Sequence, residues 1–191
     1  MSSQRPATTE IPAFLTIQGI EDVDRYLEIV RKSSVHIQEW FASNTNVLPF
    51  ELMRRLKFEP FGRHPLDDRA LNLIEQINQT FTFAAALEAT RKLLQLHPNE
   101  RFQLAPGAHA SLDLDIMSET IGLVGAEVFA AVDPRNNRKL EKDRAKLAGR
   151  TEQHRYIFFM SPGFPGTQRL VELEKCEIQV WSVDFNAPLP H

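Results

Sequence analysis

The stretch Ile121-Gly-Leu-Val-Gly-Ala-Glu-Val-Phe-Ala-Ala-Val132 decides how this chain of 191 residues folds. It contains one charged side chain, Glu127, and is otherwise apolar or glycine. Strands that are covered on both faces carry continuous apolar runs, whereas half-exposed strands alternate between apolar and polar residues. The stretch therefore predicts a strand that is buried on both faces and has a carboxylate in its middle.

Apolar runs and turn signals downstream of this strand predict two more strands and a helix. The run Tyr156-Ile-Phe-Phe-Met160 predicts a second buried strand, and Glu177–Asp184 predicts the last one. Between the first two strands, Asp133–Asn137 is typical of a turn, and Arg138–Leu147 predicts a polar helix that closes near Gly149.

Upstream of the central strand, Ser111–Ile116 alternates strictly and predicts a strand with Asp113 and Asp115 on one face. A further short helix is expected at Gln168–Leu173. The resulting order is strand, strand, helix, strand, helix, strand, and helical crossovers join strands that pair in parallel. The predicted fold class is therefore α/β with a mixed sheet.

The first hundred residues are helical in pattern and give no strand signal. We expect a disordered tail over 1–18, a helical region over 19–66 and the α/β core over 67–191. Three helical stretches are expected, namely Glu21–Ala42, Pro49–Lys57 and Asp67–Leu96, the last of them broken near Thr82.

Composition limits the class of protein. Hydrophobic residues make up 42% and charged residues 25%, so a wholly disordered chain is excluded. The single cysteine, Cys176, excludes an intrachain disulfide and a cysteine-based zinc site and fits a reducing compartment. The sequence has no apolar run near the ~20 residues of a membrane span and no signal-peptide profile at its start. The expected location is cytoplasmic, without membrane contact.

Glu127 is the residue most informative about function. Burying an unpaired carboxylate costs several kcal/mol, so this side chain needs a partner. One alternative is an ion pair with a lysine or arginine on a packing helix, and the other is a metal ion or polar cleft. If the first two strands form a hairpin, Asp113 or Asp115 converges on Glu127, and two carboxylates suit Mg²⁺ or Mn²⁺. For these two aspartates, the solvent face of an edge strand is the alternative.

The order αβββαβ, with an aspartate on one strand and a glutamate on the next, resembles the PD-(D/E)XK, or restriction-endonuclease-like, nuclease superfamily. The resemblance covers the C-terminal half, from the leading helix at Ala84–Leu96 to the strand at Ile178–Asp184. It implies a restriction-endonuclease-like core and a divalent-metal-dependent DNA nuclease or a nuclease-related protein. Asp113, or Asp115, and Glu127 would then be the metal ligands, with Mg²⁺ or Mn²⁺ as cofactor.

Phe129 departs from the pattern of that superfamily. A lysine two residues after the glutamate positions the attacking water in those enzymes, and Phe129 occupies this position here. Either Lys139 or Lys142, one turn apart on the following helix, has taken over as a catalytic residue, or catalysis has been lost. The second alternative is a catalytically inactive relative that binds nucleic acid or binds a protein partner through the N-terminal helical region. Whether the protein is an enzyme stays open at this stage.

A local excess of basic side chains follows the central strand, between Arg135 and Arg155, although the whole chain has a net charge of −3. Phosphate contacts dominate affinity for nucleic acid, so these side chains are candidates for DNA binding. An ordinary solvated helix is the alternative. The candidate nucleic-acid-binding residues are Arg135, Arg138, Lys139, Lys142 and Lys146.

Overall fold

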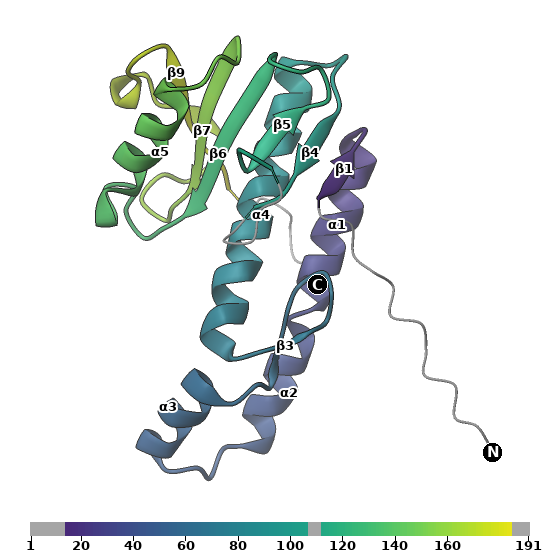
Figure 1. Cartoon of the computed structure of the whole chain (residues 1–191). Helices are drawn as coiled ribbons and strands as arrows, with labels where there is room; N and C mark the ends of the chain where they lie inside the picture. Colours follow the sequence, from purple (N-terminus) through teal and green to yellow (C-terminus); the bar gives the residue numbers. More distant parts are fainter. Residues whose placement is uncertain (1–13, 107–111, 185–191) are drawn as a thin grey trace, which may run out of the picture.

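The computed structural model describes residues 14–106 and 112–184, and its main feature is a seven-stranded sheet with helices on both faces (Figure 1). The strand order across the sheet is β1-β4-β5-β6-β7-β9-β8. The strands are β1 (Leu15–Ile17), β4 (Phe102–Leu104), β5 (Ile116–Ser118), β6 (Val124–Ala130), β7 (His154–Met160), β8 (Gln168–Arg169) and β9 (Ile178–Ser182). A separate two-stranded hairpin is formed by β2 (Gly62–Arg63) and β3 (Ala70–Leu71).

Five α-helices and two short 3₁₀ helices occur in the described part of the chain. They are α1 (Ile20–Lys32), α2 (Val35–Ser43), α3 (Pro49–Phe58), α4 (Leu73–Leu96), η1 (Asn136–Arg138), α5 (Lys139–Ala148) and η2 (Val171–Leu173). Within 14–106 and 112–184, no helix has the length and apolar character needed to cross a bilayer.

Helix α4 is continuous, so the break expected near Thr82 is wrong. The helix begins after Asn72, whose side-chain oxygen accepts a hydrogen bond from the Glu75 amide at 2.9 Å. The helix ends at Leu96, just before Pro98. The three alanines at 84–86 follow Phe83, two residues after Thr82. Alanine has the highest helix propensity of any residue, so they favour continuation of the helix through this point.

The pairing of the strands confirms an α/β fold with a mixed sheet. β4, β5 and β6 pair antiparallel, and β6 pairs in parallel with β7, which pairs in parallel with β9. Helix α5 provides the crossover between β6 and β7. In chain order the elements from α4 to β7 are therefore a helix, three strands, a helix and a strand.

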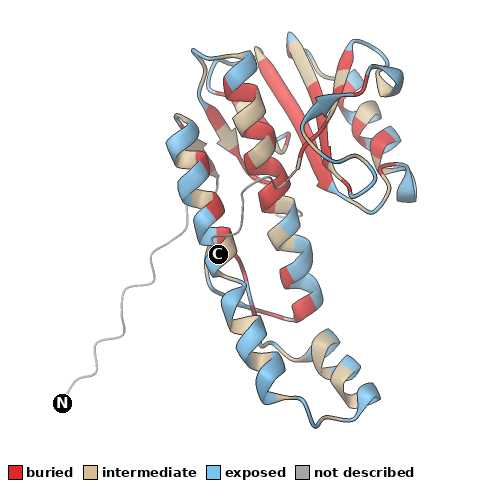
Figure 2. Ribbon diagram, turned by 180° about the vertical axis from the view of Figure 1, so that it is seen from behind, coloured by how far each residue is buried: buried red, intermediate tan, exposed pale blue. Residues whose placement is uncertain are grey.

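Both faces of the central strands are buried, as the apolar runs predict (Figure 2). On one face the strands pack against α1 and α4, and on the other they pack against α5. Successive residues alternate between the two cores. Val124, Ala126, Val128, Tyr156 and Phe158 belong to the first core, whereas Phe129, Ile157, Phe159, Leu140 and Leu147 belong to the second.

Three short elements differ from the expectations. The strand expected at Ser111–Ile116 begins only at Ile116 and runs to Ser118, and Ser111 itself lies outside the described residues. The helix expected at Gln168–Leu173 is instead the edge strand β8 followed by η2. Strand β4 was not predicted, because three residues are too few to show a periodicity.

The N-terminal segment also contributes to the sheet. Strand β1 lies inside the segment 1–18 that was expected to be a tail, and it pairs antiparallel with β4. Residues 1–13 of that tail, and the residues after Asp184, lie outside the described part. Helix α1 places Val23, Leu27 and Val30 in the first core. Helices α2 and α3 contain no buried residue and project away from the sheet (Figures 1 and 2).

A fully buried glutamine joins α4 to the elements before it. The side-chain amide of Gln76 donates a hydrogen bond to the Ser33 carbonyl at 3.0 Å, and its oxygen accepts one from the Arg63 amide at 2.8 Å. One side chain thereby satisfies backbone groups at the end of α1 and in β2, so these elements are fixed relative to α4.

We expect Gly62→Ala to lower the free energy of unfolding by about 1 to 3 kcal/mol. An added Cβ would lie 2.8 Å from the Leu71 carbonyl oxygen and 2.9 Å from the Gln76 side-chain oxygen, so the β2–β3 hairpin must shift. Urea denaturation measures the loss. The matched control is Gly149→Ala, whose Cβ comes no closer than 3.8 Å to its neighbours and which should change stability by less than about 0.5 kcal/mol. Equal stability of the two variants would contradict this packing argument.

Candidate active site

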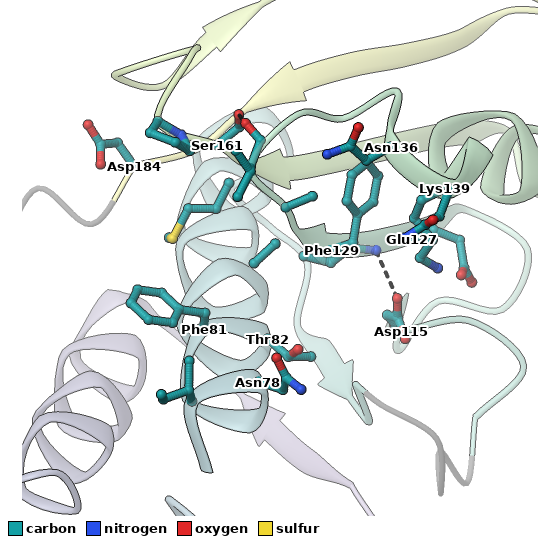
Figure 3. A pocket seen from close by; sticks show the side chains of 18 of the residues that line it. Asn78, Phe81, Thr82, Asp115, Glu127, Phe129, Asn136, Lys139, Ser161 and Asp184 are labelled. Carbon is teal, nitrogen blue, oxygen red and sulfur yellow. Dashed lines mark hydrogen bonds between the residues drawn. The ribbon is translucent and has the colours of Figure 1, made fainter. Parts of the chain in front are cut away.

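A cavity of about 1040 Å³ lies at the end of the sheet where β6 and β7 end, and it is lined by the N-terminal half of α4 on one side and by α5 on the other (Figure 3). Its charged side chains come from the residue before β5, from β6, from α5 and from the chain just after β9. In the close-up, Asp115, Glu127 and Lys139 lie on one side of the cavity, and Phe81 and Asp184 lie on the other. The predicted central residue Glu127 is therefore part of a cavity wall.

Asp115, and not Asp113, is the aspartate that lies beside Glu127. In the antiparallel pairing of β5 with β6, Ile116 is opposite Ala126, so Asp115 is level with Glu127. The Asp115 carboxylate accepts a hydrogen bond from the Val128 amide at 2.8 Å, drawn as the dashed line in Figure 3. This bond fixes the carboxylate against β6 at the edge of the cavity.

Asp113 lies elsewhere. Its carboxylate accepts a hydrogen bond from Arg150 at 3.0 Å, and its side chain is 71% exposed. Arg150 also pairs with Glu152 at 2.7 Å. The sequence suggested Asp113, Asp115 and Glu127 as metal ligands. The structure places only Asp115 beside Glu127 and leaves Asp113 at the surface.

Glu127 is buried and forms an ion pair with the packing helix. Its position in β6 directs it toward α5, on the same face as Phe129, and only 3% of the residue is exposed. The Lys146 ammonium nitrogen lies 2.6 Å from its carboxylate oxygen Oε1. The two alternatives for Glu127 are thus both met, because it has a lysine partner and it also lines a polar cavity.

Burial raises the pKa of Glu127 from 4.5 to about 7. The negative charge of Asp115 contributes to this increase, whereas the hydrogen bond and charge of Lys146 oppose it. Asp143, on α5, adds a smaller repulsion. Near neutral pH a large fraction of Glu127 therefore holds a proton, unless a cation enters the site.

A second lysine–carboxylate pair lies next to the first. Lys139 donates a hydrogen bond to the Oδ1 atom of Asp143 at 2.6 Å, and Lys139 lines the cavity. Asp143 is 3% exposed, and its other oxygen, Oδ2, has no hydrogen-bond partner. Burial raises the pKa of Asp143, and Lys139 opposes that increase. The α5 face of the sheet thus contains two carboxylates that are costly to ionise, Glu127 and Asp143.

The lysine that contacts Glu127 differs from the two that sequence reasoning selected. Lys139 is paired with Asp143, and Lys142 is exposed on α5. Lys146 had been assigned only to nucleic-acid binding. Helical spacing is the signal that identifies it, because Lys139 and Lys146 lie two turns apart beside the buried Leu140 and Leu147, whereas Lys142 points away from that face.

Phe129 has a structural role at the position where the resemblance leads one to expect a lysine. It is 5% exposed and stacks on Phe159 with 5.7 Å between ring centroids. The Lys139 ammonium lies 5.8 Å from the centroid of the Phe129 ring. A lysine at 129 would place a charge in the second core, so the cation reaches Glu127 from α5 instead.

The predicted nucleic-acid-binding residues separate into two groups. Lys139 and Lys146 line the cavity and are paired with Asp143 and Glu127. Arg135 pairs with Asp133 at 2.7 Å and, like Arg138 and Lys142, is exposed outside the cavity. Of the basic set, only the two lysines are placed where a ligand of the cavity would meet them.

Asp115 and Glu127 are the two carboxylates at this side of the cavity that could serve as ligands of a Mg²⁺ or Mn²⁺ ion. Within residues 14–106 and 112–184, no group of three or more histidine, cysteine or acidic side chains is arranged to hold a metal. Magnesium is commonly bound through one or two carboxylates, with water and substrate phosphate completing its shell. Asp115 and Glu127 can provide that pair, with Lys146 beside it.

Comparison of the chain with protein-family models, with curated proteins and with solved structures gave no match. The function is therefore argued from the geometry and charge of this cavity.

The stability of the metal-free protein should fall as pH rises from about 5 to about 8.5, and Glu127→Gln should weaken that fall. Because the folded-state pKa of Glu127 is raised to about 7, the bound proton stabilises the fold at low pH, and this contribution is lost as pH passes through 7. The glutamine still accepts a hydrogen bond from Lys146 and adds no charge near Asp115 and Asp143.

Urea denaturation in EDTA at both ends of this pH range measures the effect. The free energy of unfolding of Glu127→Gln, relative to that of the wild type, should be about 1 to 3 kcal/mol higher at pH 8.5 than at pH 5. Other groups titrate equally in the two proteins, so their contributions to the pH dependence cancel when the two free energies of unfolding are subtracted. Parallel curves for the two proteins would show that Glu127 ionises normally.

Proposed function

We propose that this protein is a divalent-metal-dependent DNA nuclease of the PD-(D/E)XK type, with Asp115 and Glu127 as metal ligands and Lys146 as the catalytic lysine. The observation that carries the proposal is the contact of 2.6 Å between the Lys146 ammonium and the Glu127 carboxylate, inside a cavity that Asp115 also lines. The order of elements from α4 to β7 supports a restriction-endonuclease-like core.

Lys146 has the chemistry that the superfamily assigns to the lysine missing at position 129. An ammonium group has three N–H donors, of which one is directed to Glu127 and the others are available to a water or a phosphate oxygen. In phosphodiester hydrolysis a water oxygen attacks phosphorus and gives up a proton to the solvent, the bond to the leaving oxygen breaks, and the leaving oxygen takes up a proton from the solvent. Lys146 would orient that water and stabilise the negative charge that develops on the phosphate.

Asp115 and Glu127 would hold the metal ion. When bound, Mg²⁺ or Mn²⁺ polarises the phosphate and lowers the pKa of a coordinated water. The carboxylate of Asp115 is already oriented by the Val128 amide, which reduces the entropy lost on binding. Glu127 must release its proton to act as a ligand, so metal binding should strengthen as pH rises toward 8.

The second candidate is a catalytically inactive relative that binds nucleic acid or a protein partner. Phe129 in the lysine position favours it, and so does the surface of the α2–α3 region. Four apolar side chains there are strongly exposed, namely Leu48 (77%), Phe50 (83%), Met53 (67%) and Phe58 (70%). Exposed apolar surface of this kind is common at protein-interaction sites.

Calorimetric titration with Mn²⁺ distinguishes the two candidates. We expect the wild type to bind Mn²⁺ and Asp115→Asn to bind it at least tenfold more weakly, because a neutral amide is a poorer ligand than a carboxylate. The matched control is Asp113→Asn, which changes the same functional group two residues away at an exposed site paired with Arg150. Absence of Mn²⁺ binding, with and without DNA, would favour the inactive relative.

Cleavage of DNA with Mg²⁺ tests the role of Lys146. Lys146→Ala should lower the cleavage rate about 100- to 1000-fold, because an oriented donor at the developing charge is removed. Lys142→Ala removes an exposed lysine one turn earlier on α5 and should change the rate less than about threefold. Equal effects of the two substitutions would remove Lys146 from the mechanism.

A further inference from the structure

The cavity continues from the carboxylates to an apolar wall on its other side. Ile77 and Phe81 of α4 form part of this wall, and Val132 and Met160, from the chain just after β6 and the end of β7, form another part. Phe81 is 48% exposed, Ile77 is 43% exposed and Val132 is 77% exposed, although all three line a cavity. Exposed apolar side chains inside a concave site are ready to contact a ligand.

The apolar wall is held in place by hydrogen bonds that do not involve a ligand. The Ser161 hydroxyl donates to the Val132 carbonyl at 2.8 Å, and the Ala131 amide donates to the Met160 carbonyl at 3.0 Å. These bonds join the ends of β6 and β7. Phe81 stands on the continuous helix α4, so it is presented from a rigid element.

Neutral hydrogen-bonding groups also line the cavity. Asn78 and Thr82 line it from α4, and Asn136 and Asn137 line it from η1 (Figure 3). Side-chain amides donate and accept at the same time, as the edges of nucleobases do. The cavity thus combines a charged side, neutral amides and an aromatic side.

We propose that Phe81 and its apolar neighbours Ile77 and Met160 form a subsite that stacks an unpaired nucleobase of the strand whose phosphate lies at Asp115 and Glu127. This inference rests on the proposed nuclease function and adds its substrate class, single-stranded or locally unpaired nucleic acid. An aromatic ring can stack only on a base whose face is uncovered, and the bases within a duplex are covered on both faces.

The size and charge of the cavity favour a single strand over a duplex. About 1040 Å³ lies at the upper end of the ~300–1000 Å³ range for pockets that enclose a ligand, so it suits a few atoms of backbone and a base. A duplex would instead lie across a broad basic surface, because its affinity depends on many phosphate contacts. Among residues 14–106 and 112–184, the cationic side chains that line the cavity are Lys139 and Lys146, and both are paired with carboxylates.

Fluorescence anisotropy tests the subsite with a labelled thymidine single strand of about ten nucleotides and a blunt hairpin duplex of the same length. Both are titrated in Ca²⁺ and, separately, in EDTA. We expect the wild type to bind the single strand at least tenfold more tightly than the duplex. Phe81→Ala should weaken single-strand binding about tenfold, and Phe81→Trp should keep the affinity and show tryptophan quenching on binding.

Ile74→Ala is the matched control, because it removes an apolar side chain of similar exposure (42%) from the same helix α4, outside the cavity, and should leave both affinities unchanged. No single-strand binding by the wild type, a preference for the duplex, or equal affinities for wild type and Phe81→Ala would each overturn the subsite. Circular dichroism of Phe81→Ala must match the wild type, as the exposure of this side chain leads us to expect.

The Mn²⁺ titration separates failure of the subsite from failure of the nuclease proposal. If Asp115→Asn weakens Mn²⁺ binding but Phe81→Ala binds the single strand as tightly as the wild type, the subsite is wrong and the metal site stands. If single-strand affinity depends on Phe81 and Mn²⁺ does not bind, the subsite stands as part of a non-catalytic binding site.

Discussion

The burial of β6 on both faces is the constraint on which the rest of the site depends. A strand in this position can hold one carboxylate only if a cation reaches it from a packing helix. Lys146 provides that cation at 2.6 Å from Glu127, and its side chain is 47% exposed, so the ammonium remains partly hydrated while the carboxylate is buried. The pair therefore fixes the rotation of α5 relative to the sheet, along with the apolar contacts of Leu140 and Leu147.

The carboxylates on this side of the sheet are only partly compensated. Asp115, Glu127 and Asp143 interact with one another and with two lysines, and burial raises the pKa of both Glu127 and Asp143. A group of acids that raise one another's pKa values is costly for a protein that only needs to fold. Such an arrangement is typical of functional sites, because a cation that binds there reduces the repulsion among the carboxylates.

The sequence predicted the elements that are long enough to show a residue pattern and missed the strands that are too short to show one. β6 and β7 were predicted because a buried apolar run extends over the whole strand, and α5 because a turn and a glycine bound a polar helical stretch. β1 and β4 have three residues each, and their existence depends on pairing with one another. No local pattern reports such a pairing, since each strand alone contains too few residues to alternate detectably.

Part of the candidate site was predictable from the sequence alone. Glu127 stands out in any reading of the sequence, because it is one charge in an apolar run. Whether Asp113 or Asp115 faces it depends on where β5 begins, and alternation alone cannot fix this point, since both lie on the same face. The spacing of the predicted helix could have indicated Lys146, two turns from Lys139, but which lysine reaches Glu127 depends on how α5 packs on β6.

The pairing of β1 with β4 has a consequence for how the chain assembles during synthesis. Leu15 is made early, yet its partner Leu104 follows only after every helix of the N-terminal half and all of α4. A pair of three-residue strands has little stability alone, so β1 becomes fixed only once β4 is supported by β5 and β6. The first segment of the described chain to leave the ribosome thus pairs only after β4, β5 and β6 have been made, and this edge of the sheet stays open until about Ala130 has emerged.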